Sequence, residues 1–251
     1  MKIAIVTGAS SGIGREFVLS ISERYKNIEE IWVIARTEEK LTELQSIIKN
    51  KKIRPITADL KNTSDISKIE ELLKEKEPDI RVLVNAAGYG RIGKFEDLSC
   101  EDNLGMCSLN ISALTHMTKI CIPYMRENSS IINIASAAAF APQPSFAVYS
   151  ATKSYVYFLS LALRKELSYK KIKVTAVCPG PVDTAFFDKA EKYTTAKLYK
   201  KMFKANPKKV VDKALTDAYH NKPKSVYGVS MKLFSLVGKL VPYNTITKFI
   251  S

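Results

Sequence analysis

The sequence has few of the residues that build metal centres and disulfide frameworks. Its 251 residues include only two histidines and four cysteines. The cysteines form no C-x-x-C pair, and too few histidines are present to complete a ligand set, so we expect no zinc site and no disulfides. Scattered thiols of this kind are typical of a reducing cytoplasm, which is the compartment we expect. The four positions are Cys100, Cys107, Cys121 and Cys178.

Long apolar runs are also absent. No stretch approaches the roughly 18 apolar residues that cross a bilayer. The N-terminal run Lys2-Ile-Ala-Ile-Val6 predicts a strand rather than a cleaved signal. The composition, 46% hydrophobic and 25% charged, is that of a globular protein with ample apolar material for a core. At this length a single α/β domain is the simplest organisation.

Acidic residues are scarce in the last third of the chain. The formal net charge is +14, and residues 164–251 hold 19 Lys and Arg against 6 Asp and Glu. Within them, the tail over residues 227–251 mixes apolar side chains with lysines. Such a basic amphipathic tail could lie on an anionic membrane, pack on a second subunit, or be core with solvated lysines. No nucleic-acid-binding motif accompanies the charge, so we do not expect nucleic acid to bind.

Short β-branched runs alternate with longer stretches of helical period along the chain. This alternation predicts one doubly wound α/β domain, with a seven-stranded, mostly parallel sheet and helices on both faces. The expected strands lie near residues 2–6, 31–35, 53–57, 80–85, 130–135, 172–178 and 225–228. A Lys- and Tyr-rich segment, 183–205, follows the sixth strand. Because open α/β sheets bind ligands beyond the carboxyl ends of their strands, we expect this segment to be a lid.

A glycine-rich loop follows the first expected strand and leads into a helical segment. Backbone without side chains can approach a pyrophosphate closely, and the amide groups and dipole of a helix N-terminus attract its charge. The loop therefore predicts a dinucleotide site. Its expected contacts are Gly8, Ser10, Ser11, Gly12, Ile13, Gly14 and Arg15.

The end of the second expected strand indicates which dinucleotide is preferred. An acidic residue there would hold the adenosine 2′-hydroxyl of NAD, whereas this chain has Ala35-Arg36. A guanidinium can pair with a 2′-phosphate through two hydrogen bonds, so NADP is favoured. Arg15, at the start of the first expected helix, could add a second contact to the same phosphate. NAD stays open, because Glu38 or Glu39 could reach the ribose and the arginines could be solvated surface charges.

Four further motifs follow in order along the chain. They are Asn85-Ala-Ala-Gly88, Ser136, Tyr149-Ser-Ala-Thr-Lys153 and Pro179-Gly-Pro-Val-Asp-Thr184. Together they resemble the short-chain dehydrogenase/reductase family in its common form of about 250 residues, over residues 2–184. The resemblance implies a Rossmann-type fold and reversible carbonyl reduction by hydride transfer. It also implies a homodimer or homotetramer, built through helices near residues 100–127 and 148–169.

The resemblance assigns catalytic roles to four residues. Tyr149 would protonate the carbonyl oxygen, and Ser136 would orient it. Lys153 would hold the ribose hydroxyls, and Asn110 would join a proton relay behind the lysine. The spacing supports the first pairing, because residues four apart on a helix share one face. A nearby ammonium favours a phenolate, so we expect Lys153 to lower the pKa of Tyr149 from about 10.

Further contacts are expected from the resemblance and from nearby aromatic residues. Asp59 matches a position that contacts adenine, and Asn85 one that braces the sheet near the cofactor. The remaining expected cofactor contacts are Leu60, Ala86, Gly88, Pro179, Gly180, Val182 and Thr184, together with Tyr149 and Lys153. Clustered apolar side chains predict a hydrophobic ketone or aldehyde as substrate. Its expected contacts are Ser136, Phe140, Phe146, Tyr149, Phe186 and Phe187.

Two other functions stay open at this point. The same chemistry could run as an NAD-dependent alcohol oxidation, or the protein could be a non-catalytic NADP-binding regulator or a membrane-associated protein. The complete set of Asn110, Ser136, Tyr149 and Lys153 favours an enzyme, because a protein that only binds the cofactor does not need it.

Overall fold

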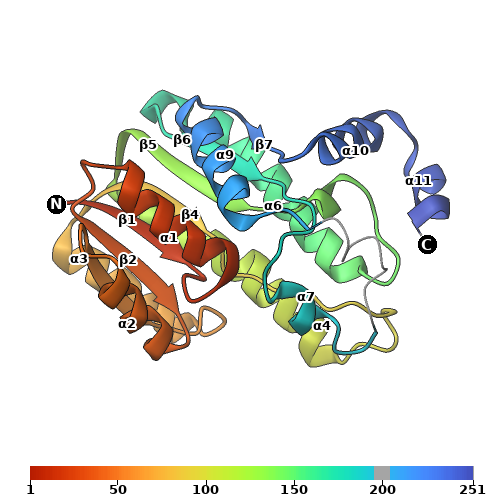
Figure 1. Ribbon diagram of the computed structural model, residues 1–251, viewed down its shortest axis with the longest axis horizontal. Helices are drawn as coiled ribbons and strands as arrows, with labels where there is room; N and C mark the ends of the chain where they lie inside the picture. The colour runs from red at the N-terminus through yellow and green to blue at the C-terminus, as the bar shows by residue number, and fades with distance from the viewer. Residues whose placement is uncertain (195–203, 251) are drawn as a thin grey trace.

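A computed structural model describes residues 1–194 and 204–250, and within them one seven-stranded sheet forms the centre (Figure 1). The strands lie in the order β3-β2-β1-β4-β5-β6-β7. All neighbouring pairs are parallel, so the predicted doubly wound sheet is confirmed and the expected mostly parallel sheet is parallel throughout. The strands are β1 (Lys2–Thr7), β2 (Glu30–Ala35), β3 (Lys52–Thr57), β4 (Asp79–Asn85), β5 (Met125–Ile134), β6 (Lys173–Val177) and β7 (Lys224–Ser225).

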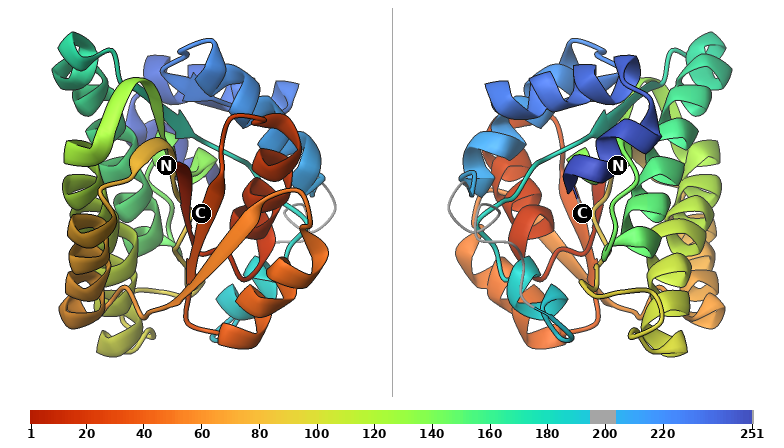
Figure 2. Two further views of the ribbon diagram at one scale, coloured as in Figure 1. Left: turned by 90° about the vertical axis from the view of Figure 1, so that its left-hand side faces the viewer. Right: turned by 90° about the vertical axis from the view of Figure 1, so that its right-hand side faces the viewer.

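Helices cover both faces of the sheet, as the two side views show (Figure 2). One layer holds α1, α2 and α9, and the other holds α3, α5 and α6. The helices are α1 (Gly12–Arg24), α2 (Glu38–Ile47), α3 (Thr63–Lys76), α4 (Cys100–Cys107), α5 (Leu114–Cys121), α6 (Ala147–Glu166), α7 (Phe186–Ala190), α9 (Pro207–Tyr219), α10 (Val229–Leu240) and α11 (Tyr243–Ile250).

Each central strand contributes side chains to two apolar cores. Ala4 and Val6 of β1 pack in the core beneath α1 and α9, whereas Ile3 and Ile5 pack in the core beneath α3 and α5. Alternate residues of a strand point to opposite faces, so a strand that is covered on both sides must be apolar at every position. The near-continuous apolar runs of the sequence therefore mark the middle of this sheet.

Helix boundaries follow local signals in the sequence. Helix α9 begins at Pro207, and the side chain of Asn206 accepts a hydrogen bond from the Lys209 amide at 3.3 Å. Helix α3 ends at Lys76, where Glu77 adopts a left-handed conformation just before Pro78. Asparagine favours the N-cap position and proline the first position of a helix, so the sequence Asn206-Pro207 accounts for the start of α9.

The structure describes part of the expected lid, residues 183–205, and almost all of the tail, residues 227–251. The ends of the 183–205 segment are joined by two backbone hydrogen bonds, Asp183 N to Ala205 O and Ala205 N to Pro181 O. Helix α7 lies within it, and residues 195–203 lie outside the described range. The tail forms α10 and α11 at one end of the protein (Figure 1). Among the described residues, no helix is long and apolar enough to cross a membrane.

Candidate active site

One elongated cavity of about 650 Å³ follows the carboxyl ends of the strands. Open α/β sheets bind their ligands at this edge. The glycine loop, Arg36, Asp59 and Leu60 line one part of the cavity, and Ser136 and Tyr149 line another. The other expected contacts on its wall are Ala86, Gly88, Phe146, Pro179, Gly180, Val182, Thr184, Phe186 and Phe187.

The glycine loop forms a tight turn that has no space for a side chain at Gly8 or Gly14. Gly8 and Gly12 have φ angles of 66° and 56°, the left-handed region that glycine adopts without strain. A Cβ on Gly14 would lie 2.2 Å from the carbonyl oxygen of Gly8. The side chain of Ser11 makes no capping hydrogen bond at the start of α1, so it does not satisfy the first N–H groups of the helix. This turn fits a pyrophosphate.

The two arginines expected near the adenosine occupy different environments. Arg36 lines the cavity, its side chain is 68% exposed, and its closest acidic partner is Asp59 at 4.0 Å. Arg15 instead forms a bidentate ion pair with Glu43 of α2, at 3.0 and 3.2 Å, and it does not line the cavity. Of the two expected arginines, only Arg36 therefore lines the cavity, where Lys61 is a further basic residue of the wall. Glu38 and Glu39 are exposed and do not line the cavity either.

Three polar side chains meet where β5 ends and α6 begins. Ser136 follows β5, and its hydroxyl caps the next turn by accepting a hydrogen bond from the Ala138 amide at 3.1 Å. Tyr149 lies in the first turn of α6 and is hydrogen-bonded to Ser136. Lys153 lies one turn later, with its Nζ 5.6 Å from the centre of the Tyr149 ring. The spacing of the two α6 residues thus brings them together, as predicted.

The expected lowering of the Tyr149 pKa is not found. Burial of the phenol raises its pKa to about 12, and the hydrogen bond from Ser136 offsets only part of this effect. Burial also lowers the pKa of Lys153 to about 8, and its Nζ donates to the carbonyl oxygen of Ile134 at 2.7 Å. Desolvation outweighs the hydrogen bond with Ser136, so the phenol is protonated near neutral pH.

Asn110 lies behind this centre and does not line the cavity. It occupies a π-helical turn, Ser108–Ala113, an irregularity that is frequent at functional sites. Its side chain bonds both backbone groups of Tyr89, at 2.9 and 3.0 Å, and donates to Thr152 Oγ1 at 3.0 Å. A Cβ on Gly88 would lie 2.8 Å from Asn110 Oδ1 and 3.4 Å from Lys153 Nζ, so the absence of a side chain at Gly88 lets both groups approach it.

Asn85 braces the sheet below the cavity. Its Nδ2 donates to Asn133 Oδ1 of β5 and to Thr118 Oγ1 of α5, both at 2.9 Å. The side chain therefore ties β4 to its neighbours and does not line the cavity.

Aromatic side chains surround Tyr149. The Phe146 ring stacks on the Tyr149 ring with a centroid distance of 4.2 Å, and Phe186 lies 5.5 Å away. Phe140 does not line the cavity, because its ring packs in the core against Tyr157 and Phe234.

Sequence reasoning missed two residues of α10 that line the cavity, Met231 and Phe234. They are three residues apart on the apolar inner face of the tail, and this periodicity was the available signal. A Cβ on Gly180 would lie 2.6 Å from Met231 Sδ, so the tail packs directly on the Pro179-Gly180 turn.

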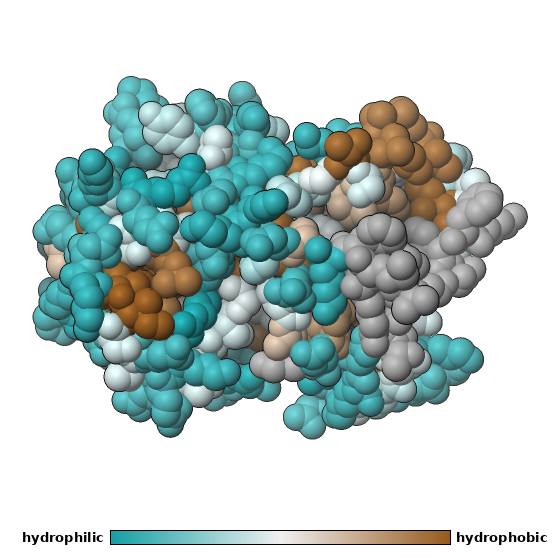
Figure 3. All heavy atoms as spheres, viewed as in Figure 1, coloured by the Kyte–Doolittle hydropathy of each residue, from teal (hydrophilic) through white to brown (hydrophobic). Residues whose placement is uncertain are grey.

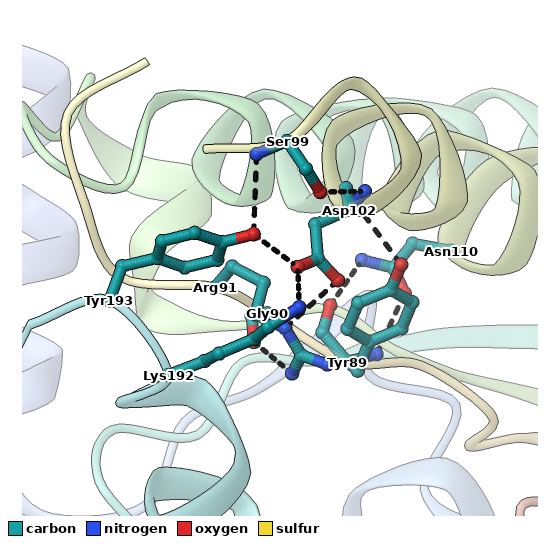
Figure 4. A network of polar contacts seen from close by, with 8 residues as sticks. All are labelled: Tyr89, Gly90, Arg91, Ser99, Asp102, Asn110, Lys192 and Tyr193. Carbon is teal, nitrogen blue, oxygen red and sulfur yellow. Dashed lines mark hydrogen bonds and ion pairs between the residues drawn. The ribbon is translucent and has the colours of Figure 1, made fainter. Parts of the chain in front are cut away.

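A buried carboxylate connects the residues after α7 to the cavity wall (Figure 4). Asp102 of α4 accepts hydrogen bonds from Arg91 Nε at 3.0 Å, Lys192 Nζ at 3.0 Å and Tyr193 OH at 2.9 Å. Burial alone would raise the pKa of Asp102, but the hydrogen bonds from Lys192 and Tyr193 and the charge of Arg91 hold it below its usual value. Arg91 and Asp102 both line the cavity.

Asp102→Asn is expected to destabilise the protein by about 1–2 kcal/mol at neutral pH, because three donors lose a charged acceptor. Since the pKa of Asp102 is lowered on folding, this stabilisation is complete above the ordinary aspartate pKa of about 4 and is lost as the pH falls through the lowered value. The substitution should also raise KM several-fold by loosening the residues after α7. Urea unfolding and steady-state kinetics measure the two effects. Asp97→Asn, at an exposed position, should change neither.

A Rossmann-type sheet with a glycine turn at one part of its cavity and a tyrosine, serine and lysine at another defines an oxidoreductase that acts with a dinucleotide. The family described as short chain dehydrogenase matches residues 2–194. The chain therefore belongs to the short-chain dehydrogenase/reductase family, whose members act with NAD or NADP. The match ends before α9, so α10 and α11 lie outside it.

Individual relatives agree with this assignment. The chain is 34% identical over 185 residues to an uncharacterised oxidoreductase of Staphylococcus epidermidis, covering 73% of this chain and 79% of that protein. Among solved structures, it is similar to a short-chain dehydrogenase from Sphingobium yanoikuyae in complex with NADPH (27% identity, TM-score 0.82, 95% and 93% of the two chains). It is also similar to the bulky-bulky ketone specific alcohol dehydrogenase from Comamonas testosteroni (27%, 0.75, 94% and 90%).

Proposed function

We propose that the protein reduces a hydrophobic ketone or aldehyde to an alcohol with NADPH. The observation that carries this proposal is the single cavity that joins Arg36 to the Ser136–Tyr149 pair. A dinucleotide lying along the glycine turn would have its 2′-phosphate beside Arg36 and its nicotinamide towards Tyr149. Within the expected lid, Thr184, Ala185, Phe186 and Phe187 line the cavity, so this described part would lie over a bound substrate. The complex of the Sphingobium relative with NADPH supports the choice of cofactor.

The residues of the chain divide the chemistry among them. NADPH, when bound, supplies the hydride. Ser136 and Tyr149 share a hydrogen bond at the cavity wall, so their hydroxyl groups can hold one carbonyl oxygen between them. Because the phenol is protonated at neutral pH, Tyr149 can donate the proton that this oxygen requires. The ammonium of Lys153, a turn away, stabilises negative charge that develops on the phenol oxygen.

The wall around Tyr149 supports a bulky apolar substrate. Phe146, Phe186 and Phe187 line the cavity together with Met231 and Phe234 from the tail. Concave sites of this kind bind apolar molecules and orient them with a few polar groups. The specificity of the Comamonas relative for bulky-bulky ketones is consistent with this substrate class.

Arg36→Asp is expected to change the cofactor preference from NADPH towards NADH. The substitution replaces the partner of the 2′-phosphate by a carboxylate that repels the phosphate and accepts from a ribose hydroxyl. We expect kcat/KM for NADPH to fall by about 10²-fold or more, since a charged hydrogen-bonding pair is lost. Cofactor consumption against a panel of hydrophobic ketones and aldehydes provides the measurement.

Arg15→Asp is the matched control, because Arg15 pairs with Glu43 outside the cavity. Its NADPH preference should stay within about twofold of the wild type. If Arg36→Asp leaves the preference unchanged, or if the wild type prefers NADH, the NADPH assignment is wrong.

Self-association through α4–α5 and α6 is a further part of the proposal. Leu104 and Phe158 on these helices are both more than 60% exposed. Exposed apolar side chains on neighbouring helices are typical of a subunit interface. Light scattering coupled to size-exclusion chromatography measures the mass directly.

A further inference from the structure

Helix α10 presents an apolar stripe on its outer face. Val229, Leu233, Leu236 and Leu240 are 81%, 61%, 53% and 73% exposed. They follow one another at intervals of four, three and four residues, the spacing that places side chains in one row of a helix. The space-filling view shows this stripe as part of a continuous hydrophobic surface over α10 (Figure 3). Water covers such a surface only at a free-energy cost, so it favours an apolar partner.

The opposite face of α10 is fixed to the body of the protein. Ser235 and Gly238 are buried, and a Cβ on Gly238 would lie 2.3 Å from the carbonyl oxygen of Phe140. Met231 and Phe234 on the same side line the active-site cavity. The helix cannot rotate its leucines inward without losing these contacts, so the stripe stays on the outside.

Positive charge lies beside the stripe. Lys232 and Lys239 are exposed and are seven residues apart, so they form a second row along the leucines. No aspartate or glutamate follows Asp217 in the sequence, whereas five lysines do. An anionic surface is complementary to this arrangement.

A second copy of the chain fits the stripe less well. If two copies faced each other through α10, Lys232 and Lys239 of one copy would lie near the same lysines of the other. The segment after Asp217 contains no acidic residue that could pair with them. Like charges at an interface are repulsive. An anionic bilayer instead accepts the leucines among its acyl chains while the lysines reach the headgroups through their flexible stems.

We propose that the α10 stripe docks the protein on an anionic lipid bilayer as a peripheral membrane enzyme. The leucines insert at the headgroup–acyl boundary, and the lysines contact anionic headgroups. Because the inner face of the same helix lines the cavity, docking places the active site next to the lipid phase. The docking surface does not rest on the proposed carbonyl reduction, and its test reads binding alone.

The test is co-sedimentation of the full chain with vesicles. We expect pelleting with phosphatidylcholine vesicles that contain about 30% phosphatidylserine, weak pelleting with phosphatidylcholine alone, and weaker binding as salt screens the charges. The triple variant Leu233→Ser/Leu236→Ser/Leu240→Ser should bind at least about tenfold less, because it loses the inserted apolar area. Lys232→Glu/Lys239→Glu should abolish the preference for anionic vesicles.

Control variants change equally exposed residues elsewhere. Ile47→Ser removes an exposed apolar side chain from α2, and Lys26→Glu/Lys49→Glu makes the same charge change far from α10. These variants should bind vesicles as the wild type does, and all variants should keep the wild-type circular dichroism spectrum.

Two results would overturn the proposal. The first is a wild-type chain that does not pellet with anionic vesicles at low salt. The second is a triple variant that pellets like the wild type. A halved solution mass of the triple variant, measured by light scattering in the absence of vesicle binding, would show that a second copy covers the stripe instead.

Discussion

Tyr149→Phe is expected to lower kcat by about 10³-fold while the affinity for NADPH stays within about twofold of the wild type. The substitution removes one hydroxyl group and keeps the ring, so the stacking on Phe146 and the packing against Phe186 are retained. What is lost is the proton donor at the cavity wall and its hydrogen bond with Ser136. In the proposed reduction, the phenol could then no longer protonate the carbonyl oxygen.

Tyr155→Phe provides the matched control, since it makes the same change on the same helix. Its hydroxyl is 3.0 Å from Thr115 Oγ1, and it does not line the cavity. NADPH consumption with a substrate that the wild type reduces gives kcat, and equilibrium binding gives the affinity. A Tyr149→Phe variant that keeps more than about a tenth of the wild-type kcat would show that another group donates the proton.

The parts of the fold that local sterics determine could be predicted from the sequence. Gly14 faces the Gly8 carbonyl so closely that no other residue fits, and this constraint is visible as a glycine pattern after an apolar strand. Asn206 and Pro207 start α9 for equally local reasons. The Tyr149–Lys153 spacing needs only a helix to bring the two side chains together.

Features that depend on tertiary partners could not be predicted. Arg15 and Arg36 look alike as sequence positions, but Arg15 is engaged by Glu43, which is 28 residues away along the chain. Phe140 precedes Tyr149 as Phe146 does, yet α10 packs against Phe140 and shares its own Met231 with the cavity. Which aromatic residue faces a substrate depends on how the tail folds back, and no local pattern encodes that.

The pKa of Tyr149 also depends on the tertiary structure and could not be predicted from the sequence. Sequence spacing showed that an ammonium would lie nearby, which favours the phenolate. It could not show how deeply the phenol is buried, and burial controls the result, raising its pKa to about 12. The proton is thereby kept on the oxygen that would donate it in the proposed reduction.

Lys153→Met is expected to make the protein more stable and nearly inactive. Burial lowers the pKa of Lys153 from 10.5 to about 8. Each pKa unit corresponds to about 1.4 kcal/mol, so keeping this ammonium charged costs the folded state about 3 kcal/mol at neutral pH. Met is of similar shape and carries no charge. The hydrogen bond from Nζ to the Ile134 carbonyl is lost, at about 1 kcal/mol, so we expect a net gain of about 1–3 kcal/mol.

The pH dependence distinguishes this explanation from simple repacking. Below about pH 8 the buried ammonium is charged and destabilises the folded state by its full amount. This cost decreases as the pH rises from about 8 towards 10.5, because the lysine is then neutral in the folded state. The difference in unfolding free energy between Lys153→Met and the wild type should therefore be largest near pH 7 and much smaller at about pH 10. Urea unfolding at the two pH values measures it. Lys165→Met, at an exposed position of α6, should show neither the gain nor the pH dependence.

Activity should change in the opposite direction. The Lys153 ammonium is the cation nearest the Tyr149 ring among the described contacts, and removing such a group costs about 10²–10³-fold in kcat. The wild-type rate of reduction should also fall above about pH 8, because Lys153 loses its charge there while the pKa of Tyr149, about 12, keeps the phenol protonated. A Lys153→Met variant that is less stable than the wild type, or a wild-type rate that stays flat to pH 10, would contradict this account. Folding alone would favour the methionine, so a buried charge that is kept at a cost in stability supports the proposed role of Lys153 in the reduction.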